Sequence, residues 1–183
     1  EYGRITETGS TEKVVEAYLD TTESISCKPL EHREDRTGNG LLKFTNLSVG
    51  NVNGEHIFQL QPGMNVEFKI NYHLHSGESL SNVVVQLQFN DLYDQPIFTC
   101  TSRVSNSEYL TVFPHGEISC SIDYLPLLPG RYYIDIWCKA SEGIADWVKR
   151  AGVVEVVPND VFGTGKLPTS GKILTSFHWS TKV

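Results

Sequence analysis

Strict alternation of apolar and polar residues runs through most of the chain after residue 40 and limits its fold more than any other feature. It is clearest in NVEFKINYHL, residues 65–74, where Val66, Phe68 and Ile70 alternate with Glu67 and Lys69. The same period recurs in residues 41–49, 82–90, 116–124, 130–139 and 151–157. It is typical of strands in antiparallel sheets that bury one face and leave the other in water.

Short turn signals separate these segments, among them QPG, SGES, DLYDQP, FPHG and LPG. Many alternating strands with no helical segment between them predict an all-β fold, an antiparallel β-sandwich of the jelly-roll or immunoglobulin-like type. The residues expected on the inner face of the two most regular strands are Val83, Val85, Leu87, Phe89, Tyr132, Ile134, Ile136 and Cys138.

The first 40 residues have a different character. A short strand and turn in YGRITETG are followed by a helical pattern in STEKVVEAYL, for which Ser10 or Thr11 can serve as the N-cap. Residues 21–40 are polar and charged, with two glycines, a composition typical of linkers. The sequence therefore predicts a short N-terminal helix with no evident partner in residues 41–183, followed by a linker.

Composition and charge exclude several classes of partner. The 183 residues carry a formal net charge of −7, and the calculated isoelectric point is near 5.3. Nucleic acids and anionic membranes require a basic face, so we expect no nucleic-acid partner. No apolar run reaches the ~18 residues of a membrane-spanning helix, and the first residues lack the features of a signal peptide, so we expect no direct membrane insertion.

Four cysteines lie at positions 27, 100, 120 and 138. Cys120 and Cys138 fall in register with apolar neighbours, which favours buried free thiols in a reducing compartment over a disulfide framework. No C-x-x-C motif is present, which speaks against a structural zinc site. His73 and His75 form an H-x-H on one strand face, but two solvated histidines explain it better. We expect no metal site.

The sequence contains none of the common catalytic signatures. It has no G-x-x-x-x-G-K-[ST], no H-E-x-x-H and no G-x-S-x-G. Carboxylates such as Glu67, Asp123 and Asp135 alternate with core residues and are expected at the surface. No spacing indicates the paired carboxylates of a glycosidase. We therefore expect no enzymatic activity from this chain.

The polar face of the sheet has an unusual composition for a surface. If Ile134, Ile136 and their neighbours point inward, an outward-facing set remains on two strands, made of Tyr133, Asp135, Trp137, Lys139, Gln86, Gln88 and Asn90. Aromatic rings beside amides and a carboxylate suit a sugar, because the rings stack on its C–H faces and the polar groups meet its hydroxyls. The alternative, left open by the sequence, is that another segment or a dimer partner covers this face.

The C-terminal third resembles a known family. GIADWVKRAGVVEVV followed by FGTGKLP and a terminal HW is similar to the C-terminal domain of Wzt-like ATP-binding subunits of O-antigen polysaccharide ABC exporters. The family's G-x-Y strand corresponds to Gly130–Tyr132, and its D-W hairpin to Asp146 and Trp147. NDLYDQPIF resembles a further hairpin of the family but lacks the usual glycine after the turn. The resemblance covers roughly residues 40 to 180.

The first 20 residues resemble the last strand, turn and helix of an ABC ATPase domain, through Gly3, Ile5, Gly9, Val14 and Tyr18. The resemblance divides the chain into the end of an ATPase domain (1–20), a linker (21–40) and a carbohydrate-binding β-sandwich (41–183). It implies no cofactor in this fragment, since ATP and Mg²⁺ belong to the missing ATPase domain.

The resemblance implies a non-catalytic, cytoplasmic module, peripheral at the inner face of the bacterial inner membrane. It would bind O-polysaccharide glycan at its non-reducing end and select it for export, with the permease subunit contacted through the missing ATPase domain. It also implies a homodimer formed by the C-terminal segment, about residues 160–183, although this segment could instead fold back on its own domain. Gly163, Gly165 and Gly171 would act as hinges.

The expected sugar site contains Trp137 and Tyr133 as stacking platforms. Its expected hydrogen-bonding partners are Gln86, Gln88, Asn90, Asp135 and Lys139. Trp147 and Tyr93, in hairpins, are secondary candidates. Two other functions remain open from the sequence: an accessory carbohydrate-binding module of a glycoside hydrolase, and a pure dimerisation or interaction domain.

Overall fold

The structure is a computed structural model that describes residues 8–10, 29–51, 55, 57, 59–105, 109–140, 143–168 and 170–181. The N-terminal helix expected within residues 1–20 lies outside the described residues, as does Cys27. The identity of residues 1–20 as the end of an ATPase domain therefore stays a prediction.

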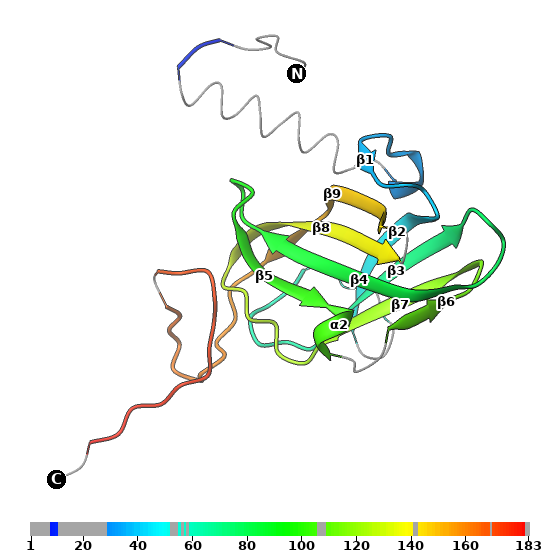
Figure 1. The fold of residues 1–183 in the computed structure, drawn as a ribbon. Coiled ribbons are helices and arrows are strands. Elements are labelled where there is room, and N and C mark those ends of the chain that lie inside the picture. Colours follow the sequence, from blue (N-terminus) through cyan, green and yellow to red (C-terminus); the bar gives the residue numbers. More distant parts are fainter. Residues whose placement is uncertain are drawn as a thin grey trace.

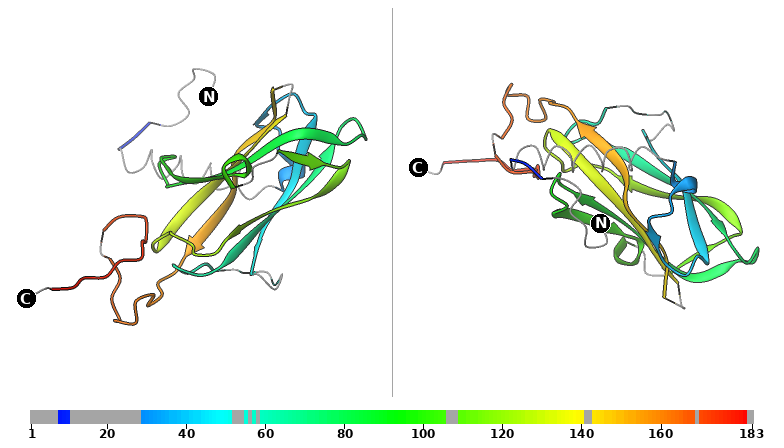
Figure 2. Two further views of the ribbon diagram at one scale, coloured as in Figure 1. Left: turned by 60° about the horizontal axis from the view of Figure 1, so that its bottom comes forward. Right: turned by 90° about the horizontal axis from the view of Figure 1, so that it is seen from above.

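The described chain is built almost entirely of strands. In order, its elements are η1 (Leu30–His32), β1 (Arg36–Thr37), β2 (Leu42–Gly50), β3 (Val66–Leu74), β4 (Leu80–Asn90), β5 (Pro96–Thr101), α2 (Ser102–Ser105), β6 (Leu110–Val112), β7 (His115–Ile122), β8 (Gly130–Ala140) and β9 (Gly143–Val156). They form a six-stranded sheet in the order β1-β9-β8-β4-β5, with β6 also paired to β4, and a three-stranded sheet in the order β2-β3-β7. Figures 1 and 2 show the two sheets as separate layers. The predicted antiparallel β-sandwich is confirmed.

The core lies between the layers and follows the alternation of the sequence. The inner residues of β4 and β8 that the sequence predicts are all at most 5% exposed. Phe68 of the smaller sheet meets Phe89 of the larger one edge to face, with ring centroids 5.3 Å apart, and Phe89 stacks on Phe98 at 4.3 Å. Interdigitated side chains of this kind hold two sheets together through apolar burial.

The N-terminal segment from residue 30 onward belongs to the sandwich and not to a linker. Arg36 of β1 donates a hydrogen bond from Nη1 to Asp146 Oδ2 of β9 at 2.7 Å, and the amide of Phe44 of β2 donates to the same oxygen at 2.9 Å. Asp146 therefore joins an edge strand, its neighbour and the opposite sheet. The linker expected over residues 21–40 overlaps η1 and β1. Arg33 and Arg36 look like linker charges in the sequence, but Arg33 is buried, Arg36 is half-buried, and both are hydrogen-bonded to the sandwich.

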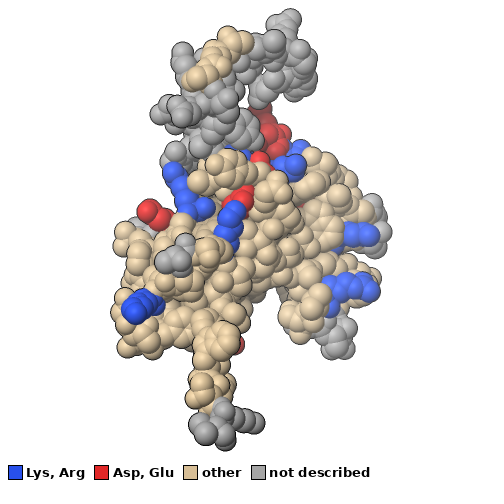
Figure 3. Space-filling model, turned by 90° about the vertical axis from the view of Figure 1, so that its left-hand side faces the viewer, with Lys and Arg blue, Asp and Glu red and all other residues tan. Residues whose placement is uncertain are grey.

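Residues 172–174 of the C-terminal segment pack against the domain, and the residues after them project from it. Leu128 N donates to Lys172 O at 3.0 Å, Leu127 forms an antiparallel bridge with Ile173, and Leu174 is only 2% exposed. Beyond residue 174 the chain projects from the body, and its described part carries no Lys, Arg, Asp or Glu (Figures 1 and 3). No helix within the described residues is long and apolar enough to cross a membrane.

Replacing Asp146 with alanine is expected to lower the free energy of unfolding by about 3 kcal/mol, measured by urea denaturation. The change leaves the Arg36 guanidinium and the Phe44 amide without their shared acceptor in a buried place. Glu67→Ala is the control, since Glu67 pairs with Lys69 at 3.5 Å on an open face, and is expected to cost less than about 1 kcal/mol. Equal losses in the two variants would contradict the role given to Asp146.

Candidate functional site

A shallow hollow of about 180 Å³ opens on the outer face of the six-stranded sheet, on the side away from the core. Its lining side chains come from β4, β8 and β9 and are Gln86, Gln88, Asp135, Trp137 and Trp147. Each of them is half-buried. Four of these five residues are among those that the sequence predicts for the sugar site.

Strand register explains why these side chains meet. Gln86 lies directly opposite Trp137, and Gln88 lies opposite Asp135, in the β4–β8 ladder. Trp137 in turn lies opposite Trp147 in the β8–β9 ladder. Directly opposed residues of antiparallel strands share one face with Cβ atoms ~5 Å apart, so the five side chains form one continuous patch.

An irregularity in β9 holds Asp135, one of the residues that line the hollow. The β8–β9 register shifts between Ile134 and Ile136, and within the extra residues of β9 Arg150 has φ +47°. The Arg150 amide donates to Asp135 Oδ1 at 2.7 Å. Arg33, 2% exposed, supports the irregular stretch by donating to Lys149 O at 2.8 Å and to Arg150 O at 3.1 Å. Bulges often aim a side chain in this way next to a binding site.

The expectation that Tyr133 offers its ring to a ligand is wrong. Tyr133 lies on the outer face, opposite Asn90, but is only 2% exposed. The guanidinium of Arg150 covers its ring at 4.4 Å from the centroid and is held there by Asp94 at 2.8 Å. The cover comes from a bulge and a distant hairpin, which alternation along β8 does not reveal.

The remaining predicted residues have different surroundings. Asn90 is 1% exposed and acts inside the sheet face, where its Oδ1 accepts a hydrogen bond from Gln88 Nε2 at 2.9 Å and its amide bonds to Asp135. It positions its neighbours and does not face a ligand. Lys139 is exposed but lies outside the lining of the hollow, and Tyr93 is 71% exposed on the β4–β5 turn.

Trp147 lines the hollow, although the sequence makes it only a secondary candidate for the sugar site. The D-W motif suggests that Trp147 lies in a hairpin at the sheet edge. It lies instead within β9, a 14-residue strand, directly opposite Trp137. The Lys149 ammonium lies 5.2 Å from the centroid of its ring. Cation–π contact at this distance is favourable and helps to hold the ring in place.

Burial raises the pKa of the Asp135 carboxyl above its usual value of 3.8, although hydrogen bonds from the Arg150 amide and the Asn90 side chain act in the opposite direction. Both oxygens can still accept, because each carboxylate oxygen has two lone pairs. The hollow thus offers two indole rings, two amides and one carboxyl group.

Such a set of groups is suited to stacking on and hydrogen bonding with polar, ring-shaped ligands. Among the residues described here, the lining contains no hydroxyl, thiol or imidazole, and Asp135 is its one carboxyl group. Within the same described ranges, no group of three or more His, Cys, Asp or Glu side chains gathers in a way that could hold a metal ion.

The fold and this hollow define a β-sandwich domain with a polar, aromatic outer face. The sequence profile of the Wzt C-terminal domain matches residues 33–171. The chain therefore belongs to the Wzt C-terminal domain family and is a domain of a Wzt-like ABC transporter subunit, distinct from the part that carries the ATPase.

Solved structures agree on the fold. The crystal structure of the C-terminal domain of Wzt superposes with a TM-score of 0.67 at 14% identity, over 85% of this chain and 93% of that one. A Pseudomonas fluorescens alkylpurine DNA glycosylase bound to DNA matches with a TM-score of only 0.41, at 9% identity over 85% of this chain and 41% of that one. This second similarity is too weak to indicate a shared fold. No curated protein matches this chain in sequence.

Carbon-13 NMR of the carboxyl groups is expected to show Asp135 titrating above pH 3.8 and Asp91 below it. At Asp91 burial would raise the pKa, but hydrogen bonds from Lys172 and from the Gln95 and Tyr93 amides outweigh it. Folded Asp135 binds its proton more tightly than the unfolded chain does, so its contribution to stability falls as pH rises from 3.8 through its raised pKa.

The contribution of Asp91 has the opposite sign: it is present above pH 3.8 and is lost as pH falls below that value. Asp135→Asn should remove the first dependence and leave the second. A titration of Asp135 at or below pH 3.8 would show that the hollow does not desolvate its carboxyl group.

Proposed function

We propose that the outer-face hollow binds a glycan and that this domain acts by recognition and not by catalysis. The observation that supports the proposal best is the convergence of Trp137 and Trp147 with Gln86, Gln88 and Asp135 on one open patch. Indole faces attract the C–H faces of pyranose rings, while amides and a carboxylate exchange hydrogen bonds with hydroxyls. A hollow of about 180 Å³ has room for roughly one sugar ring, with the rest of the chain lying across the sheet.

Membership of the Wzt C-terminal domain family supports a more specific role for the site. In this proposal the ligand is an O-antigen polysaccharide, bound near its non-reducing end and thereby selected for export across the inner membrane. The subunit would lie in the cytoplasm at the inner face of that membrane and contact the permease through its ATPase domain. The alternative of an accessory module of a glycoside hydrolase has no specific observation in its favour.

Trp137→Ala is expected to weaken binding of the producing cell's purified O-polysaccharide by about tenfold or more, equivalent to ~1.4 kcal/mol. Isothermal titration calorimetry measures the change, and circular dichroism checks that the variant is folded. Trp147→Ala should act in the same direction. The matched control is Trp179→Ala, because Trp179 is 92% exposed on the C-terminal segment and lies outside the hollow.

Saturable binding that survives Trp137→Ala and Trp147→Ala in folded protein would place the glycan elsewhere. Absence of any binding by the folded wild-type domain would favour the remaining alternative, a pure interaction domain whose aromatic face is covered by protein.

We further propose that the C-terminal segment joins two copies of the domain. Phe177 is 52% and Trp179 is 92% exposed on an uncharged projecting segment, an arrangement that leaves apolar surface in water unless another chain covers it. An extended segment of this kind can add to a sheet edge of a second copy. The observed return of residues 172–174 to their own domain is compatible with this. Phe177 also contacts Phe162 of its own chain, with ring centroids 5.2 Å apart, but both Phe177 and Trp179 keep more than half of their surface exposed.

Deletion of residues 175–183 is expected to convert a dimer to a monomer, as measured by size-exclusion chromatography with light scattering. The double variant Phe177→Ser, Trp179→Ser should do the same without shortening the chain. Tyr93→Ser is the control, since Tyr93 is equally apolar and 71% exposed but lies on the β4–β5 turn. A wild-type protein that is monomeric at high concentration would overturn the dimer proposal and leave the glycan proposal intact.

A further inference from the structure

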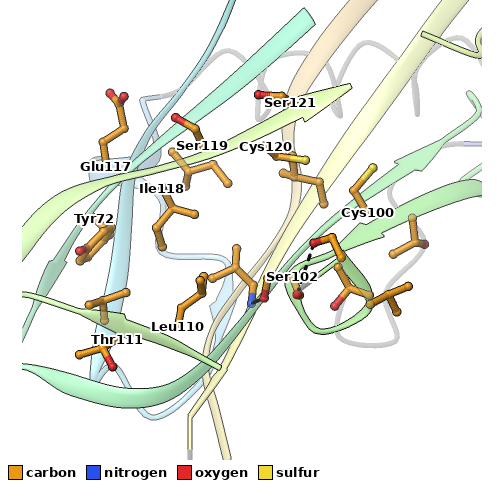
Figure 4. A pocket seen from close by; sticks show the side chains of 18 of the residues that line it. Tyr72, Cys100, Ser102, Leu110, Thr111, Glu117, Ile118, Ser119, Cys120 and Ser121 are labelled. Carbon is orange, nitrogen blue, oxygen red and sulfur yellow. Dashed lines mark hydrogen bonds between the residues drawn. The ribbon is translucent and has the colours of Figure 1, made fainter. Parts of the chain in front are cut away.

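One side of the sandwich is open. A cavity of about 750 Å³ lies where β5, an edge strand of the larger sheet, approaches β7, an edge strand of the smaller one, with α2 and β6 on its rim. Figure 4 shows side chains from both sheets pointing into it. The inward-facing residues of β7, such as Ile118 and Cys120, are only half-buried, in contrast to the fully buried inner residues of β3 and β8.

Two cysteines face each other across this opening. Cys100 lies on β5, opposite Leu87 of β4, and Cys120 lies on β7, opposite Phe68 of β3. The two belong to different sheets, and both line the cavity (Figure 4). The two thiols are close enough for each to shift the pKa of the other. Both are free thiols in this structure, and both are half-buried.

We propose that Cys100 and Cys120 form a reversible, oxidant-dependent disulfide that staples the two sheets together and closes the open side of the sandwich. The proposal does not depend on glycan binding, because the hollow lies on the other face of the larger sheet. Both thiols line the cavity, one on each edge strand, and in the proposed product their sulfur atoms lie at the ~2.05 Å of a disulfide bond.

The reaction is thiol–disulfide exchange with a small disulfide such as glutathione disulfide. The Cys120 thiolate attacks one sulfur of the oxidant and forms a mixed disulfide, and one glutathione leaves as its thiolate. The Cys100 thiol then loses its proton, and its sulfur attacks Cys120 Sγ and displaces the second glutathione. Overall, two protein thiols are oxidised to one disulfide while one glutathione disulfide is reduced to two glutathione molecules.

The surroundings of the thiols favour Cys120 as the attacking group. The neighbouring Cys100 thiol lowers the pKa of the Cys120 thiol, and burial opposes this effect. The same contact, together with burial, raises the pKa of Cys100. Cys138 serves as an internal contrast: it is 0% exposed in the core, and burial raises its pKa to about 12, so it should stay unreactive.

The test uses the full chain with Cys27→Ser, which removes the thiol that lies outside the described residues. Native protein is incubated with glutathione disulfide and analysed by intact mass and by peptide mapping. We expect a product lighter by two hydrogen atoms, with the Cys100 and Cys120 peptides linked and reversible by dithiothreitol. Its Tm should rise by roughly 6 to 12 °C, because the bond closes residues 100–120 into a loop in the unfolded chain.

Three further variants make the result specific. Cys100→Ser and Cys120→Ser should each stop at the mixed disulfide with glutathione and show no rise in Tm. Cys138→Ala should still form the linked product. The proposal is overturned if native protein yields only mixed disulfides, or if the Cys100–Cys120 link forms in urea-unfolded protein but not in native protein.

Discussion

The buried carboxylate of Asp146 is the contact on which the arrangement of the two sheets depends. It accepts from Arg36 of β1 and from the backbone of β2, so a single side chain of β9 connects an edge strand and the opposite layer. Burial raises the pKa of the Asp146 carboxyl, and the hydrogen bond from the Phe44 amide and the positive charge of Arg36 offset only part of that rise. A buried ion pair of this kind adds little net stability over apolar packing, but removing one partner strongly lowers the free energy of unfolding. The pair therefore favours the arrangement in which β1, β9 and β2 are neighbours.

The same N-terminal segment also supports the outer face of the larger sheet around the hollow. Arg33 donates to two carbonyl groups of the irregular stretch in β9, and that stretch presents the Arg150 amide to Asp135. The Arg150 side chain turns the other way, over Tyr133 and toward Asp94. One bulge thus both holds Asp135 and covers the neighbouring ring of Tyr133, so the open part of the face is confined to the two tryptophans and their polar partners.

Alternation along each strand was enough to predict the fold class, the inner face of β4 and β8, and an outward direction for Gln86, Gln88, Asp135 and Trp137. That these four residues share one surface depends on the β4–β8 pairing, which the sequence left open. The burial of Tyr133, the central place of Trp147 and the buried role of Asn90 depend on contacts between residues far apart in sequence, such as Asp94 and Arg150. Strand order and bulge position decide those contacts, and neither has a signature in a single sequence.

The attachment of residues 172–174 also limits how far residues 175–181 can reach from the domain. Leu174 is fixed against the loop that precedes β8, so everything beyond it starts from a defined point on the surface. Residues 175–181 span at most about 25 Å when fully extended. Any surface that Trp179 touches must therefore come within that radius of Leu174, which restricts a second molecule to positions close to one end of the sandwich.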